Sequence, residues 1–131
     1  MTETSFEIKE RPFFQAKIPV LSLNQVLMRH AKELNAPTIR PPREKTGSTD
    51  FGNVMFDVPG SCIRVAFVPE GTSAHSQEYL DAGKGEAAAL CTILAAKILA
   101  ASAWDLISQP ELLKEVCEEF QQAKRQMELD Q

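Results

Sequence analysis

The sequence predicts a fold of the α/β class, because β-type runs and helical patterns occur in the same chain. Residues 5–10 alternate apolar and polar side chains, as a short strand does. Residues 63–68 form a compact β-type run between two turns that contain Pro and Gly, and we expect a buried strand there. Two long helical patterns follow residue 86. We therefore expect strands and helices within one domain.

A first helix is expected from Ser22 to about Asn35, after an extended connector that contains Pro12 and Pro19. Ser22 can cap its beginning, and Pro37 ends it. One face of this helix carries its apolar side chains: Leu23, Val26, Leu27, Ala31 and Leu34. His30 is interpreted as an exposed residue of the same helix.

A second long helix is expected from Glu86 to Ser108, and it is apolar on nearly every face. Lys97 at its centre and Asp105 near its end would be costly in hydrocarbon, which favours a helix buried in a protein core over a membrane span. Pro110 suits the first turn of a last helix, where Glu111 lies beside the positive end of the helix dipole.

Length and charge restrict the function classes. The chain has 131 residues, enough for one domain with a core, and its net charge of −4 with scattered Lys and Arg argues against a nucleic-acid partner. Three widely spaced cysteines and an N-terminus without an apolar leader pattern predict reduced thiols and a cytoplasmic location.

Two polar loops are the candidate sites. The turn Gly47-Ser48-Thr49-Asp50 offers backbone N–H groups and two hydroxyls beside a carboxylate, which is typical of a polar binding loop. The second loop carries His75, three residues before Glu78, and leads toward the long apolar helix. From the residues alone, His75 is either a metal ligand or an ordinary loop histidine, and no complete catalytic constellation is present.

These segments resemble one known family. The block Gly47 to Val54, then Val58-Pro59-Gly60, then Gly71-Thr72 with His75 and Glu78-Tyr79, is similar to the zinc-dependent aminoacylase/carboxypeptidase family of amidohydrolases. The branch it resembles includes β-alanyl-lysine dipeptidase and p-aminobenzoyl-glutamate hydrolase. The resemblance runs from about Ser22 to Phe120.

The resemblance implies that residues 22–131 are the C-terminal part of a di-zinc catalytic domain, an incomplete central sheet flanked by helices. Residues 1–21 would be the remnant of a hinge or lid exit. It also implies that His75 is a ligand of zinc or another divalent metal, and that Gly47, Ser48, Thr49 and Asp50 hold the substrate, a dipeptide or N-acyl amino acid. The other metal ligands and the general base of the family have no counterpart here.

Two functions of different classes follow from this interpretation. The first is a piece of a metal-dependent amidohydrolase that is inactive alone. The alternative is a non-catalytic module that acts by association with a full-length relative. In either case we expect no nucleic-acid or membrane partner, and we expect self-association through the apolar surface of the segment from Glu86 to Ser108.

Overall fold

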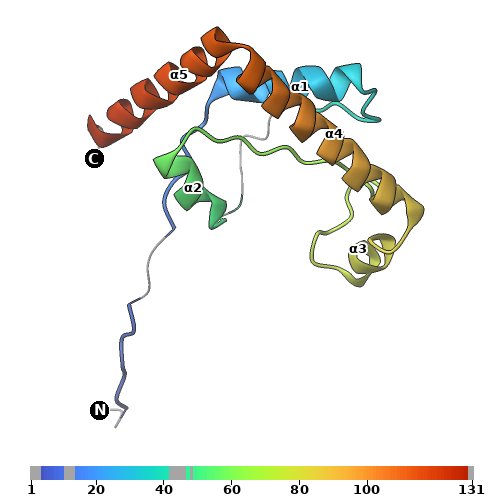
Figure 1. Ribbon diagram of the computed structural model, residues 1–131. Coiled ribbons are helices and arrows are strands. Elements are labelled where there is room, and N and C mark those ends of the chain that lie inside the picture. The colour runs from blue at the N-terminus through green and yellow to red at the C-terminus, as the bar shows by residue number, and fades with distance from the viewer. Residues whose placement is uncertain (1–3, 11–13, 42–46, 48, 130–131) are drawn as a thin grey trace.

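The computed structural model describes residues 4–10, 14–41, 47 and 49–129. Within them the chain forms five helices, arranged as Figure 1 shows. Their bounds in chain order are α1 Leu21–Glu33, α2 Phe51–Asp57, α3 Gln77–Ala82, α4 Glu86–Ser108 and α5 Pro110–Leu129. The expected helices at 22–35, at 86–108 and after Pro110 are confirmed, whereas the short helices α2 and α3 were not expected.

The expected α/β class, with a central sheet, is wrong for the part of the chain that the structure describes. That part contains helices and no strand. Residues 5–10 and 63–68 lie in irregular chain, and their backbone groups pair with no neighbouring strand. A β-type run becomes a strand only when a second run supplies its hydrogen bonds, and neither run has such a partner here.

One core cluster lies where α1 meets α5. Its buried members are Ile18, Val20, Leu23, Val116 and Phe120. The beginning of α1 is held by a side chain of α5: Glu119 accepts hydrogen bonds from the backbone N–H of Leu21 at 2.6 Å and of Ser22 at 2.9 Å. A carboxylate there satisfies N–H groups that have no partner within the helix and faces the positive end of its dipole. Ser22 also donates its hydroxyl to Glu119 at 2.5 Å, so it does not cap α1 with its own side chain.

A second core cluster lies between α1 and α4, and its buried members are Leu27, Ala31 and Ile98. The expectation that α4 is buried in a core is nevertheless wrong in this structure. Only Ile98 and Ser102 of α4 are buried, while large apolar side chains such as Leu90, Leu99 and Trp104 are exposed. The reason is that α4 packs mainly on α1 and α5, which cover one side of it.

Helix α4 is long and apolar enough to cross a membrane. Core helices of water-soluble proteins can have the same length and composition. In the structure the hydrophilic side chain of Asp105 near its end is engaged with α1, as described below. The expectation that the chain has no membrane partner therefore stays a prediction.

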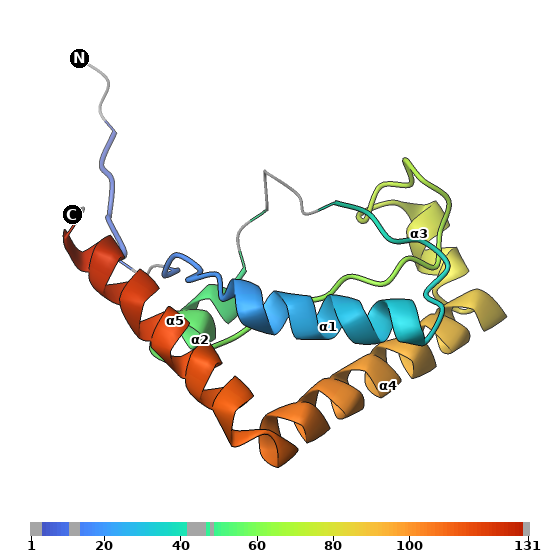
Figure 2. The same cartoon turned by 90° about the horizontal axis from the view of Figure 1, so that it is seen from above.

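The three longer helices enclose the interior of the molecule, with α4 and α5 meeting at an angle around α1 (Figure 2). Helix α2 is fixed beside α5, because the Lys124 ammonium group donates to the carbonyl of Phe56 at 2.8 Å and lies 4.6 Å from the centre of its ring. Helix α3 lies at the other end of the molecule, near the beginning of α4.

Candidate functional site

The predicted substrate loop leads directly into α2. The hydroxyl of Thr49 accepts a hydrogen bond from the N–H of Phe51 at 3.3 Å, and its carbonyl accepts one from Gly52 at 3.0 Å. Asp50 is exposed and precedes the helix, and Gly47 is exposed as well. Ser48 lies outside the described residues. Thr49 thus helps to begin a helix, while the carboxylate of Asp50 stays open to solvent.

The Gly-Asn pair of this block has a structural role that sequence reasoning missed. A Cβ atom on Gly52 would lie 2.4 Å from the carbonyl oxygen of Gln15, so only glycine lets that chain segment pass so closely. Beside it, the side-chain oxygen of Asn53 accepts a hydrogen bond from the N–H of Gln15 at 2.8 Å. A glycine within a helix was the signal that could have indicated this close approach.

The second predicted site residue, His75, is exposed on the turn before α3. The turn is organised by Ser76, whose hydroxyl donates to the carbonyl of Ser73 at 2.9 Å and accepts from the N–H of Tyr79 at 3.2 Å. The Tyr79 ring packs against Phe67 at a centroid distance of 4.8 Å. Glu78 is exposed in the first turn of α3. These contacts fix the turn and leave the imidazole of His75 facing solvent.

The structure does not bring the two predicted loops together. Helix α2, which follows Asp50, and helix α3, which follows His75, lie toward opposite ends of the molecule in both views (Figures 1 and 2). Among the described residues there is also no group of three or more His, Cys, Asp or Glu side chains that could hold a metal ion. A zinc site needs at least three protein ligands, so the described residues do not form one by themselves.

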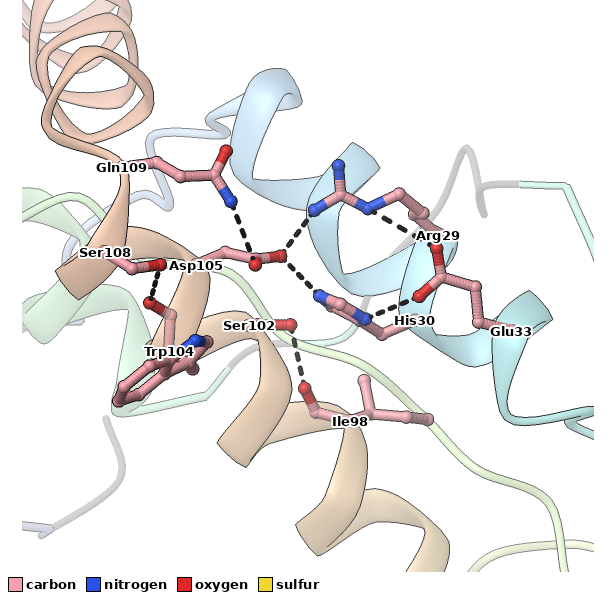
Figure 3. Close-up of polar contacts among 9 residues, drawn as sticks. All are labelled: Arg29, His30, Glu33, Ile98, Ser102, Trp104, Asp105, Ser108 and Gln109. Carbon is pink, nitrogen blue, oxygen red and sulfur yellow. Dashed lines mark hydrogen bonds and ion pairs between the residues drawn. The ribbon is translucent and has the colours of Figure 1, made fainter.

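Among the described residues, the side-chain cluster with the most polar contacts lies elsewhere, between α1 and α4. We name it the α1–α4 polar cluster, and Figure 3 shows its members: Arg29, His30, Glu33, Asp105 and Gln109. His30 lies 2.5 Å from Asp105 through Nε2 and 2.9 Å from Glu33 through Nδ1. Arg29 donates to the same carboxylate at 2.5 Å, and Gln109 donates to its other oxygen at 3.0 Å.

The expectation that His30 is exposed is wrong. Its side chain is 13% exposed and that of Asp105 is 14% exposed, so both lie against the packed surface of α1 and α4. The signal was present in the sequence, since His30 follows Leu27 by three residues and Val26 by four and therefore shares their buried face. The hydrogen bond from His30, with the charge of Arg29 beside it, lowers the pKa of Asp105 below its usual value.

The α1–α4 polar cluster has the geometry of a structural link. Both carboxylate oxygens of Asp105 have a partner in the same molecule, and both ring nitrogens of His30 lie beside a carboxylate (Figure 3). The same holds for Glu119, whose pKa is lowered by its hydrogen bonds to Ser22 and Leu21 against the opposing effect of its partial burial. The titratable groups with altered pKa values therefore join helices.

The chain is similar in sequence to dipeptidases. It is 48% identical over 77 residues to Xaa-Arg dipeptidase of Mus musculus and 42% identical over 76 residues to Xaa-Arg dipeptidase of Homo sapiens. In each case the match covers 57% of this chain and 17% of the relative's length. No family model matches the chain, and no solved structure does.

This likeness supports the dipeptidase/aminoacylase resemblance that the loop motifs indicate. It does not select the branch with β-alanyl-lysine dipeptidase and p-aminobenzoyl-glutamate hydrolase. Because the matched segment is about a sixth of each relative, the activity of those enzymes does not pass to this chain by similarity alone.

Proposed function

We propose that this chain is part of a metal-dependent hydrolase that cleaves dipeptides, with a C-terminal arginine as the preferred substrate class. The observation that carries the proposal is the 48% and 42% identity to two enzymes named Xaa-Arg dipeptidase. In this proposal the remaining catalytic groups are supplied by polypeptide that corresponds to the unmatched length of those relatives.

Within that enzyme we assign His75 the role of one metal ligand. Its support is the family-like motif around it and its position on a fixed turn with an exposed imidazole, open to ligands from another part of the protein. A single imidazole holds a metal only weakly, so the metal would bind where further ligands complete the shell. Zinc is the first candidate, because imidazole and carboxylate are its usual ligands in hydrolases.

The second assignment is that Gly47, Ser48, Thr49 and Asp50 contact the substrate. Of these, Thr49 uses its hydroxyl to begin α2, so the exposed Asp50 is the side chain best placed to meet a ligand among the described residues. Helices α2 and α3 lie toward opposite ends of this structure. One substrate would therefore contact both loops only if the rest of the enzyme changes their relative position.

A transplant experiment tests the proposal. This chain replaces the matching segment of the Mus musculus Xaa-Arg dipeptidase, and hydrolysis of an Xaa-Arg dipeptide is measured with zinc supplied. We expect activity in the hybrid and none in this chain alone. His75→Ala in the hybrid should abolish activity and reduce bound metal, while Gln77→Ala, an exposed neighbour, should change neither. A folded hybrid without activity would contradict the proposal.

The alternative function, a module that associates with a full-length relative, is favoured by one observation. Several large apolar side chains of α4, such as Leu90, Ile93 and Trp104, are more than half exposed, and exposed apolar surface is typical of sites that bind another protein. Mixing this chain with the intact Mus musculus enzyme separates the two functions. A stable complex in which the added chain has no role in turnover would favour the module.

A further inference from the structure

Residues 61–67, which we name the extended segment, follow α2 and run alongside α1 and α4 toward α3 (Figures 1 and 2). Ser61 donates its hydroxyl to the side chain of Asn24 in α1, and Ile63 packs on the core cluster between α1 and α4. The side chains alternate: Ile63, Val65 and Phe67 are half-buried, whereas Cys62, Arg64 and Ala66 are exposed. This alternation is that of a strand lying on a core.

The backbone of the extended segment has almost no partner among the described residues. No N–H group of residues 62–67 donates to a backbone carbonyl there, and the carbonyl of Val65 accepts only the thiol of Cys91 at 3.3 Å. Such a row of free backbone groups is a template for pairing with another extended chain.

An apolar cavity of about 330 Å³ adjoins this edge. Val65 and Phe67 line it from the extended segment, and Leu90 and Leu94 line it from α4. It has room for an aromatic side chain. Leu90 is 59% exposed, so one wall of this cavity is open to solvent.

A second segment of the same chain that lies outside the helices can complement this edge. Residues 5–10, which we name the arm, extend away from the helices (Figures 1 and 2). Phe6 is 86% exposed and Ile8 is 76% exposed. Glu7 and Lys9 lie on the same side of the arm, where their charged groups are 3.6 Å apart. The arm therefore has an apolar face and a charged face, in strand alternation.

We propose that the arm of one copy pairs with the extended segment of a second copy, in an antiparallel register that places Glu7 opposite Arg64. This register also sets Phe6 opposite Val65 and Ile8 opposite Ile63, so both apolar residues of the arm lie over the cavity side. Arg64 has no ionic partner among the described residues, and Glu7 complements its charge.

The segment that pairs with this edge comes from a second copy of the chain, because the arm of the same copy points away from it. The arm of each copy is directed away from its own helices, and the two residues of its apolar face, Phe6 and Ile8, are mostly exposed. Reciprocal exchange of two arms gives a closed dimer, pairs both backbone edges and covers Phe6 and Ile8 in each copy. An antiparallel pair is also slightly more stable per residue than a parallel one.

Disulfide trapping tests the register. In the proposed pairing Lys9 lies opposite Cys62, which is exposed and free. We expect Lys9→Cys in a Cys117→Ser background to form a disulfide with Cys62 under mild oxidation, and Ser5→Cys, which a parallel register would place there, to form little. Mixing ¹⁵N-labelled and unlabelled chains should give mixed disulfides by mass spectrometry. A bond confined to one chain, or formed through residue 5 instead, would overturn the proposal.

Charge reversal tests the pairing in solution with the full chain. Sedimentation velocity should show a dimer whose dissociation constant rises about tenfold in Arg64→Glu and returns toward the original value in Glu7→Arg/Arg64→Glu. Lys114→Glu, an exposed reversal on α5, serves as the control and should leave the dimer unchanged. A protein that stays monomeric at all concentrations, or a double reversal that restores nothing, would overturn the proposal. Neither result bears on dipeptidase activity.

Discussion

The end of the molecule where α1 meets α5 and the end that carries α3 are organised in opposite ways. At the α1/α5 end, Ile18, Val20 and Phe120 are almost completely buried, and the Glu119 carboxylate holds the first turn of α1. At the α3 end, the helix itself has no buried residue, and its turn is fixed mainly by short-range hydrogen bonds of Ser73 and Ser76.

The well-packed end of the molecule is its scaffold, whereas the candidate functional residues lie in thinly packed or exposed parts. The buried cluster and the polar links between helices give the chain its shape, while His75 lies on the thinly packed end and Asp50 lies on an exposed turn. Binding residues often lie on loops that a rigid scaffold positions. The α3 end also carries the open cavity and the end of the extended segment, where we propose that the arm of a second copy packs.

The largest expected difference between the two ends is in stability. Phe120→Ala should lower the free energy of unfolding by about 3–5 kcal/mol, because it removes a fully buried ring and leaves a cavity. Leu80→Ala on α3, where the side chain is mostly exposed, should change it by less than about 0.5 kcal/mol. Urea unfolding followed by circular dichroism measures both. Equal losses would mean that the two ends are packed alike.

The next effect concerns the link between α5 and the beginning of α1. Glu119→Ala should lower the free energy of unfolding by about 1–2 kcal/mol, because two N–H groups of α1 lose their acceptor. Glu118→Ala, the exposed neighbour, is the matched control and should have little effect. If both variants unfold at the same urea concentration, the carboxylate does not stabilise α1.

The same link predicts a pH dependence. The pKa of Glu119 is lower in the folded chain than its ordinary value of 4.5, so the unfolded chain binds more protons as the pH falls. The stabilisation is fully present above pH 4.5 and is lost as the pH falls through the folded pKa. Unfolding of the original chain and of Glu119→Gln should therefore differ at pH 6 and converge toward pH 3. A difference that persists unchanged at low pH would contradict this origin.

The sequence was sufficient for the three longer helices, α1, α4 and α5, because their signals are local. Pro110 begins α5 at its first position, and the left-handed Asn35, with φ of 54°, follows the last turn of α1 before Pro37. Strands depend instead on a partner. The runs at 5–10 and 63–68 have strand-like alternation, but neither is paired with another run among the residues that the structure describes.

The candidate site was predictable only as a set of motifs. The loops at 47–50 and 75–79 could be found from their residue types, yet their separation depends on the path of the chain between α2 and α3. The burial of α4 was mispredicted for a related reason, since a helix that is apolar all round does not indicate which face packs. Asp105 contacts His30, which is 75 positions away in the sequence. Local sequence patterns do not predict contacts over such a separation.

The smallest expected effect compares the two histidines directly. His30→Ala should lower the midpoint of thermal unfolding by a few degrees, because Asp105 loses one partner and keeps Arg29 and Gln109. His75→Ala should leave that midpoint nearly unchanged, since His75 is exposed and its truncation opens no cavity in the core. Loss of the hydrogen bond from His30 should also raise the pKa of Asp105, which carboxylate NMR titration can measure. Two results would contradict this: a normal pKa for Asp105 in the unsubstituted chain, or equal unfolding midpoints for both variants. Either would mean that the α1–α4 polar cluster does not join the helices in solution. The difference in stability between the two ends would then come from the apolar core alone.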